Sequence, residues 1–204
     1  MTKEEVDQII DQMTAPFDAD AITLETDRLL LRPVNPNDLT DIHEIVSDPA
    51  VAATAGFSLS ESLEESEKRV LQYMDDKDTL AVVLKQNGKL IGTVFLQKRN
   101  WAMYPIAHDQ QGREFGFDLN RAYWGRGLIP EAVGAVRDYC FRVLRYDFLT
   151  AGHFLENSQS QRAIEKCGFV FLFEAEHENP GKWKKMIRTW IQYNPQKENG
   201  LCLN

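Results

Sequence analysis

The chain has 204 residues, of which 43% are hydrophobic and 26% are charged, so it is long enough to bury a core and short enough for one domain. No apolar run approaches the roughly 18 to 20 residues that span a bilayer, which argues against a membrane protein. No export signal is visible, so we expect a soluble protein of the cytoplasm. The formal net charge of −8 argues against a nucleic-acid-binding protein, which normally has a basic face. The same charge suits a cationic partner such as an amine, or simply a soluble surface.

Cysteine and histidine give no sign of a metal site or a disulfide framework. The three cysteines are odd in number and widely spaced, without a Cys-x-x-Cys pair, which supports neither disulfides nor a zinc knuckle. The four histidines do not have the spacing of metal ligands. We therefore expect no metal.

The first third of the chain predicts one strand and three helices. Residues 2–13 have the apolar spacing of a short amphipathic helix outside the main core. Residues 22–34 (ITLETDRLLLRPV) predict a first strand, and Asn35-Pro36 then supplies the cap and first-turn proline of a helix. A second helix of the domain is expected after Ser58.

The remainder predicts strands alternating with two helices. Residues 79–97 form two β-rich runs around Asn87-Gly88, a strong hairpin signal. A long connection follows, then a strand in REFGFDL, a helix after Gly127, a strand in DFLTAGHF, a helix over 158–166 and a final hairpin. This order predicts one mixed α/β domain over residues 22–194, with 1–21 and 195–204 as terminal appendages.

The stretch NRAYWGRGLIPEAVGAV, residues 120–136, carries the clearest sign of a ligand. Two glycines, Gly125 and Gly127, come directly before a helix with Pro130 in its first turn. The first N–H groups of a helix have no internal partners and a partial positive charge, and a loop thinned by glycine lets an anion approach them. A tight turn in which glycine only permits a positive φ explains the same residues. The last glycine of the dinucleotide fingerprint is missing, and no Gly-Lys-Ser/Thr is present.

A second stretch, NSQSQRAIEKCGF at 157–169, favours the anion site. Together the two stretches resemble the signatures of the GNAT superfamily of N-acetyltransferases, and with TDRLLLRPV they look most like its RimJ/RimL-type branch. The resemblance covers about residues 24 to 193. It implies the acyl-coenzyme A N-acyltransferase fold, a single mixed and mostly antiparallel sheet of about six to seven strands flanked by helices.

The resemblance also implies where acetyl-coenzyme A binds. The backbone N–H groups from Trp124 to Leu128 would hold the pyrophosphate, and the strand edge from Phe117 to Leu119 would pair with the pantetheine arm. Asn157 would hydrogen-bond the same arm, and Arg162 would lie near the phosphates. The implied cofactor-binding residues are therefore Phe117, Leu119, Trp124, Gly125, Arg126, Gly127, Leu128, Asn157 and Arg162.

The chain departs from the superfamily at two positions. Ala122 stands three residues before Gly125, where many members have Gln or Arg, and the RimJ/RimL-type branch commonly lacks that residue too. Ile164 stands where many relatives have a tyrosine that protonates the leaving thiolate. That role must be carried elsewhere or be absent.

Acetyl transfer to an amine needs the amine to be neutral. At pH 7 this costs roughly 1 kcal/mol for an α-amine and roughly 4.6 kcal/mol for a lysine amine, so a base matters most for lysine-like acceptors. Glu114, on the strand expected beside the thioester, is the candidate base, directly or through a water, or else an exposed strand glutamate. The resemblance to the branch implies that Ser160, the serine of Asn-x-x-Ser, faces the coenzyme sulfur, so Ser160 is the candidate proton donor. The alternative is a hydroxyl that satisfies backbone donors early in a helix. Cys167 invites a covalent mechanism, although a packing role suits its place at a helix end better.

These features predict an acetyl-coenzyme A-dependent N-acetyltransferase acting on a protein N-terminal α-amine or a small amine. By analogy with the branch, the acceptor pocket would be lined by residues 53–60 and by the connection 98–111, which includes His108. The alternatives are a catalytically weak coenzyme A-binding module of the same fold and, more remotely, another nucleotide-binding protein. The resemblance to the family also implies a homodimer.

Overall fold

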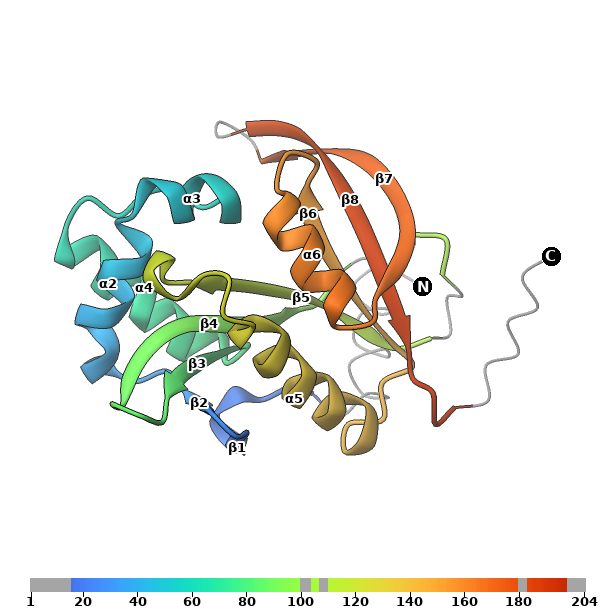
Figure 1. Ribbon diagram of the computed structural model, residues 1–204, viewed down its shortest axis with the longest axis horizontal. Helices are drawn as coiled ribbons and strands as arrows, with labels where there is room; N and C mark the ends of the chain where they lie inside the picture. Colours follow the sequence, from blue (N-terminus) through green and yellow to red (C-terminus); the bar gives the residue numbers. More distant parts are fainter. Residues whose placement is uncertain (1–15, 100–103, 107–109, 180–182, 198–204) are drawn as a thin grey trace, which may run out of the picture.

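An eight-stranded sheet forms the centre of the computed structural model, which describes residues 16–99, 104–106, 110–179 and 183–197 (Figure 1). Its strands lie in the order β1-β2-β3-β4-β5-β6-β8-β7, and only β5 and β6 pair in parallel. The strands are β1 (Leu24–Glu25), β2 (Leu29–Pro33), β3 (Thr79–Leu84), β4 (Lys89–Gln97), β5 (Gly112–Leu119), β6 (Phe148–Phe154), β7 (Val170–Asn179) and β8 (Trp183–Tyr193). The predicted mixed, mostly antiparallel sheet is confirmed.

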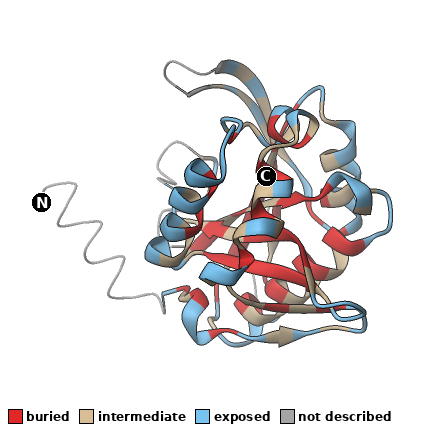
Figure 2. Cartoon of the chain, turned by 90° about the vertical axis from the view of Figure 1, so that its left-hand side faces the viewer, coloured by how far each residue is buried: buried red, intermediate tan, exposed pale blue. Residues whose placement is uncertain are grey.

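Helices cover both faces of this sheet. The helices are α2 (Leu39–Val46), α3 (Pro49–Ala55), α4 (Leu63–Asp76), α5 (Leu128–Arg142) and α6 (Ser158–Lys166), with short 3-10 turns η1 (Ala19–Ala21), η2 (Pro36–Asp38) and η4 (Arg121–Tyr123). Side chains alternate between the faces of a strand, so Leu80 and Val82 of β3 join the core beneath α5, while Ala81 and Val83 join the core beneath α2 and α4. Figure 2 shows the buried residues concentrated along the central strands.

Strands β5 and β6 pair over only part of their length. Their register runs from Gly112↔Phe148 to Phe115↔Ala151 and stops there, although β5 continues to Leu119 and β6 to Phe154. Beyond this point the two strands diverge (Figure 1). The sheet therefore opens a gap between two strand edges in its middle.

The sheet has more strands than the six to seven expected, because residues 22–34 form two strands rather than one. The chain turns at Thr26, whose N–H donates to the carbonyl of Leu29, and β1 and β2 then pair as an antiparallel hairpin. Because apolar residues stand on both sides of this turn, the sequence pattern did not reveal the turn.

Helix α3 was not predicted, although its signals are present. The Asp48 side chain accepts from the N–H of Ala50, Pro49 is in the first turn, and Gly56 ends the helix with φ 76°. Helix α4 begins later than expected from Ser58, because the Ser62 side chain caps it by accepting from the N–H of Glu65. The shortness of α3 left little periodicity to detect.

The chain ends are described only in part. The predicted helix over residues 2–13 lies outside the described residues. Phe17 and Ala19 pack into the same core as β2 and α5, while the predicted domain boundaries at 22 and 194 stay predictions. None of the helices in the described part of the chain is long and apolar enough to cross a membrane.

Candidate active site

The start of α5 is built as the sequence predicts. Gly125 and Gly127 have φ values of 75° and 71°, in the left-handed region that favours glycine. A Cβ at Gly125 would meet no atom within 4 Å, so this glycine is required by the backbone angle and leaves open space beside the loop. Gly127 is the N-cap residue of α5, and no side chain caps the helix.

The loop before α5 offers main-chain donors to a ligand. Among the described residues, the N–H groups of Gly125, Arg126 and Gly127 make no well-formed hydrogen bond within the chain, and that of Leu128 lies in the unpartnered first turn. The N–H of Trp124, which was predicted to join them, donates instead to the carbonyl of Arg121 at 3.2 Å. Its indole Nε1 donates to the carbonyl of Leu119 at 2.7 Å, which ties the loop to the end of β5. An anion at this loop would therefore meet donors from Gly125 onward.

A cleft of about 1230 Å³ connects this loop to the gap between β5 and β6. Every predicted site residue lines it: Phe117, Leu119, Trp124, Gly125, Arg126, Gly127 and Leu128, then Glu114, Asn157, Ser160 and Arg162. Residues 54–57, from the segment predicted to line an acceptor pocket, lie on its wall as well. His108 lies outside the described residues.

Helix α6 meets the cleft with a capped first turn and with side chains. Asn157 caps it, because Asn157 Oδ1 accepts from the N–H of Ser160 at 2.9 Å and Nδ2 donates to the carbonyl of Thr54 at 3.1 Å. This capping differs from the predicted contact with the pantetheine arm, which stays a prediction. The half-buried Ser160 and the exposed Arg162 also line the cleft.

Glu114 lies on the opposite face of β5 from Phe115, as the alternation predicts. Its side chain is 17% exposed, and its Oε1 accepts from Nη2 and Nε of Arg99 at 2.7 and 3.0 Å. The hydroxyl of Tyr104 donates to its Oε2 at 3.5 Å. Burial, and then the Glu114 charge, raise the pKa of Tyr104 to about 12. Glu114 is therefore a partnered carboxylate rather than an exposed strand glutamate.

Two other groups on the cleft wall had no predicted role. Asp118 is buried, accepts from the N–H and hydroxyl of Thr93 at 3.0 and 2.9 Å, and has its pKa raised by burial to about 6. His153 is 5% exposed, and its Nδ1 donates to the carbonyl of Phe154 at 2.8 Å. Its Nε2 is buried without a hydrogen-bond partner among the described residues, and burial lowers its pKa. A single aspartate or histidine inside a strand gives no distinct sequence signal, so neither Asp118 nor His153 was predictable as a site residue.

The site residues give no sign of covalent or metal chemistry. Cys167 is buried away from the cleft lining, and burial raises the pKa of its thiol to about 11. Among the described residues, no group of three or more His, Cys, Asp or Glu side chains is arranged to hold a metal ion. The packing role of Cys167 agrees with its burial.

An α/β sheet that opens between two parallel neighbours, beside an uncapped helix start, defines a class of anion-binding α/β proteins. The acetyltransferase (GNAT) domain family matches residues 28–170, and the chain belongs to this family. It is an N-acetyltransferase.

Individual proteins and structures agree with the family. The uncharacterized N-acetyltransferase p20 of Bacillus licheniformis is 28% identical over 155 residues, which cover 72% of this chain and 82% of that protein. The crystal structure of a GNAT family acetyltransferase from Bacillus anthracis is similar with a TM-score of 0.74 at 22% identity, covering 85% and 99% of the two chains.

Two further solved structures share the fold. One is a ribosomal-protein-S5-alanine acetyltransferase from Vibrio fischeri, with a TM-score of 0.69 at 20% identity over 86% of this chain and 98% of that one. The other is a spermidine N-acetyltransferase from Vibrio cholerae in complex with CoA and spermine, with a TM-score of 0.66 at 21% identity over 83% and 97%.

Proposed function

We propose that the protein transfers an acetyl group from acetyl-coenzyme A to a primary amine, directly within a ternary complex. The observation that carries this proposal is that one cleft joins the uncapped start of α5, the gap between β5 and β6, and the Glu114 carboxylate. We further propose that the chain lies in the RimJ/RimL-like branch, which its motifs and its similarity to the ribosomal-protein alanine acetyltransferase support.

The residues at the α5 start fit the phosphates of the coenzyme. The N–H groups of Gly125, Arg126, Gly127 and Leu128 would hold the pyrophosphate, with the partial positive charge of the helix start behind them. The cationic side chains of Arg126 and Arg162 line the same cleft. Acetyl-coenzyme A, when bound, supplies the activated acetyl thioester.

The gap between the strands fits the pantetheine arm. The β5 edge from Phe117 to Leu119 has no strand partner on its β6 side within the described sheet, so its main-chain groups are available to an extended ligand. Asn157 stands at the same gap and would contact the arm as well. The arm would thereby bring the thioester toward Glu114 and Ser160.

Glu114 would take the proton from the amine, directly or through a water, and Ser160 would supply one to the departing thiolate. Arg99 holds the Glu114 carboxylate in the cleft through its two hydrogen bonds to Oε1. Because an α-amine needs roughly 3.6 kcal/mol less than a lysine amine to become neutral at pH 7, we propose a protein N-terminal α-amine or a small amine as the acceptor.

A catalytically weak coenzyme A-binding module is the second candidate. Two observations favour it: Ile164, a fully buried aliphatic residue, stands where a proton-donating tyrosine is common in the superfamily, and Arg99 occupies Oε1 of Glu114. Such a protein would bind the coenzyme and release no thiol with any amine.

Release of free thiol from acetyl-coenzyme A against α-amine peptides, polyamines and lysine peptides tests both candidates. We expect Glu114→Gln to lower kcat/KM about 100-fold or more, as loss of a general base does, with the larger loss on the acceptors of higher pKa. Glu174→Gln is the matched control, because Glu174 is also an ion-paired strand glutamate but lies outside the cleft lining.

Ser160→Ala is expected to lower kcat by about tenfold, since a thiol of pKa about 8.5 leaves with little help. Ser158→Ala, at the first position of the same helix and outside the cleft lining, is its control. Full activity in both Glu114→Gln and Ser160→Ala would refute these roles, and absence of thiol release by the wild type would favour the binding module. The homodimer and the cytoplasmic location stay predictions.

A further inference from the structure

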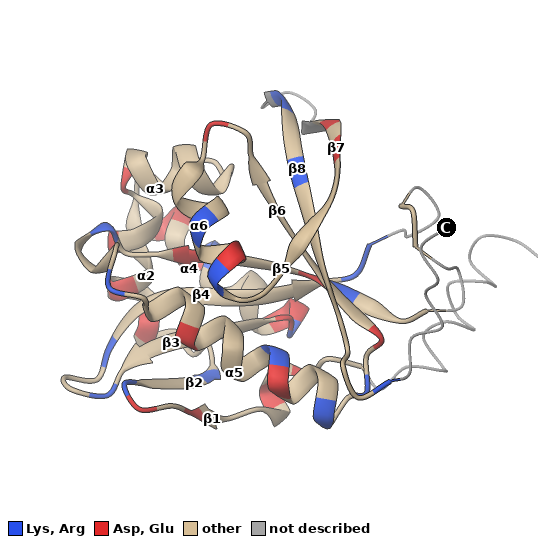
Figure 3. Ribbon diagram, turned by 45° about the vertical axis from the view of Figure 1, so that its right-hand side comes forward, with Lys and Arg blue, Asp and Glu red and all other residues tan. Residues whose placement is uncertain are grey.

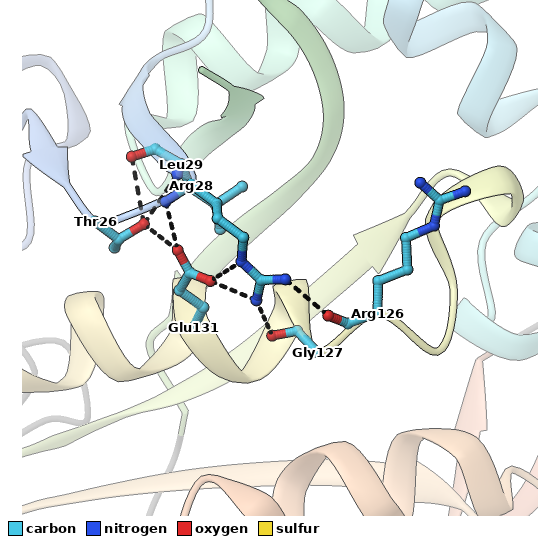
Figure 4. Close-up of polar contacts among 6 residues, drawn as sticks. All are labelled: Thr26, Arg28, Leu29, Arg126, Gly127 and Glu131. Atoms are coloured by element: carbon cyan, nitrogen blue, oxygen red, sulfur yellow. Dashed lines mark hydrogen bonds and ion pairs between the residues drawn. The ribbon is translucent and has the colours of Figure 1, made fainter. Parts of the chain in front are cut away.

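Arg28 joins the hairpin between β1 and β2 to the loop before α5 (Figure 4). Its Nη1 donates to the carbonyl of Arg126 at 3.0 Å and its Nη2 to the carbonyl of Gly127 at 3.2 Å. Its Nε donates to Oε2 of Glu131, in the first turn of α5, at 2.6 Å. One guanidinium thus holds two successive carbonyls of the loop and a carboxylate of the helix that follows.

Glu131 completes this contact from the helix side. Its Oε1 accepts from the hydroxyl of Thr26 and from the N–H of Arg28, the latter at 3.0 Å. Burial alone would raise the pKa of the Glu131 carboxyl, but the hydrogen bonds from Thr26 and Arg28 outweigh it and lower that pKa. The carboxylate is therefore ionised at neutral pH and fixes the guanidinium against the hairpin.

The contact fixes the direction of two main-chain donors. In a trans peptide the C=O and N–H point to opposite sides, and no cis peptide occurs among the described residues. The carbonyl of Arg126 shares its peptide with the N–H of Gly127, and the carbonyl of Gly127 shares its peptide with the N–H of Leu128. Turning both carbonyls toward Arg28 therefore turns both N–H groups away from Arg28, and Gly127 and Leu128, which carry these groups, line the cleft.

The Arg126 side chain takes no part in this contact. It points away from Arg28 and Glu131 in Figure 4, and its guanidinium lies 5.2 Å from the ring centre of Tyr123. The Arg126 cation is thus separate from this contact and lines the cleft, while Arg28 holds the loop through its carbonyls.

We propose that Arg28, fixed by Glu131 and Thr26, is a positioning residue for the diphosphate of coenzyme A: it sets the orientation of the Gly127 and Leu128 N–H groups. This role rests on the proposed use of acetyl-coenzyme A. Arg28 acts through the fork of its guanidinium, whose planar, fixed donors meet two carbonyls and a carboxylate at once. A lysine carries the same charge without that geometry.

Equilibrium binding tests this role without knowledge of the acceptor. Three ligands are compared by calorimetry: CoA, dephospho-CoA, which keeps the diphosphate, and pantetheine at millimolar concentration, which lacks it. We expect Arg28→Lys and Arg28→Met each to weaken CoA and dephospho-CoA by about tenfold or more, the size of one charge-assisted hydrogen bond, and to leave pantetheine binding unchanged.

Lys85→Gln is the matched control. Lys85 contacts the same hairpin, donating to the carbonyl of Thr26 at 3.1 Å and pairing with Glu25 at 3.2 Å, but it makes no contact with the loop before α5. We expect this variant to bind all three ligands as the wild type does. The unfolding temperature of each ligand-free variant shows separately whether a loss of binding reflects a loss of folding.

Three results would overturn the positioning role. Wild-type affinities in Arg28→Lys would mean that the charge of the side chain suffices. Wild-type affinities in Arg28→Met would mean that the contact does not affect CoA binding. An equal loss of pantetheine affinity would mean that the variants loosen the whole cleft. A wild-type protein that binds no CoA would refute the proposed function itself, and this outcome is recognised before any variant is compared.

Discussion

Helices α5 and α6 both start at the cleft, but their first turns are satisfied in different ways. The start of α6 is capped by its own Asn157, whose Oδ1 takes the N–H of Ser160. The start of α5 has glycine at the cap position and no side-chain cap, and it is held from behind through its carbonyls by Arg28. A helix start that satisfies its own amides has less to offer an anion. The difference supports the proposal that α5 binds phosphate through its main chain while α6 contributes side chains.

The largest effect on the difference between the two helix starts is expected from a negative charge placed at the start of α5. Gly125→Asp puts a carboxylate where the diphosphate is proposed to bind, and repulsion of about 4 kcal/mol at 4 Å is expected to weaken CoA at least 100-fold. Gly125→Asn is the matched control, because Asn and Asp both tolerate a positive φ and a Cβ here meets no atom within 4 Å. Calorimetric Kd values measure the effect, and equal affinities in the two variants would exclude a phosphate at this loop.

Removing the cap of α6 should affect stability first. Asn157→Ala is expected to cost about 1 kcal/mol of unfolding free energy and to lower the unfolding temperature by about 2 to 4 °C, as measured by calorimetry. Asn157→Asp keeps the accepting oxygen and should keep most of that stability.

The CoA affinity of Asn157→Asp then distinguishes helix capping from contact with the pantetheine arm. Weaker CoA binding at unchanged stability would support the contact with the pantetheine arm that the family resemblance implies. Unchanged CoA binding would limit Asn157 to capping.

The smallest expected effect is the loss, at low pH, of the stability that Glu131 contributes. The pKa of Glu131 is lowered in the folded protein, so its contribution to stability is present above the ordinary pKa of glutamate and is lost as the pH falls through the folded-state value. The difference in unfolding temperature between wild type and Glu131→Gln should therefore be about 2 °C at pH 7 and smaller at pH 3, because partly exposed ion pairs contribute about 1 kcal/mol or less. Glu64→Gln, in an exposed pair with Lys68, should show a smaller change with pH, and a Glu131→Gln difference that does not vary with pH would contradict this.

Local signals in the sequence predicted the features that depend on neighbouring residues. The turn at Asn87-Gly88, the helix after Gly127 and the helix over 158–166 each follow from glycine, asparagine or proline at a fixed offset, and all three lie where predicted. The cleft residues followed from the family resemblance, since no local rule brings β5 and α6 together.

Contacts between distant segments were not predictable in this way. Arg28 and Glu131 lie 103 residues apart, as do Asn157 and Thr54. The partner of Glu114, Arg99, comes from a connection whose path no periodicity fixes. Charge gave little guidance either, because acidic and basic residues are scattered over the structure (Figure 3).

The early end of the pairing between β5 and β6 has a consequence for which side chains along the gap can vary. An extended ligand in the gap acts as a surrogate strand, recognised through peptide groups that every amino acid carries. Replacing Phe117 or Leu119 by another apolar residue would then change the width of the slot without changing its hydrogen-bonding pattern. Side chains along the gap can then vary while the same main-chain groups remain available to the ligand.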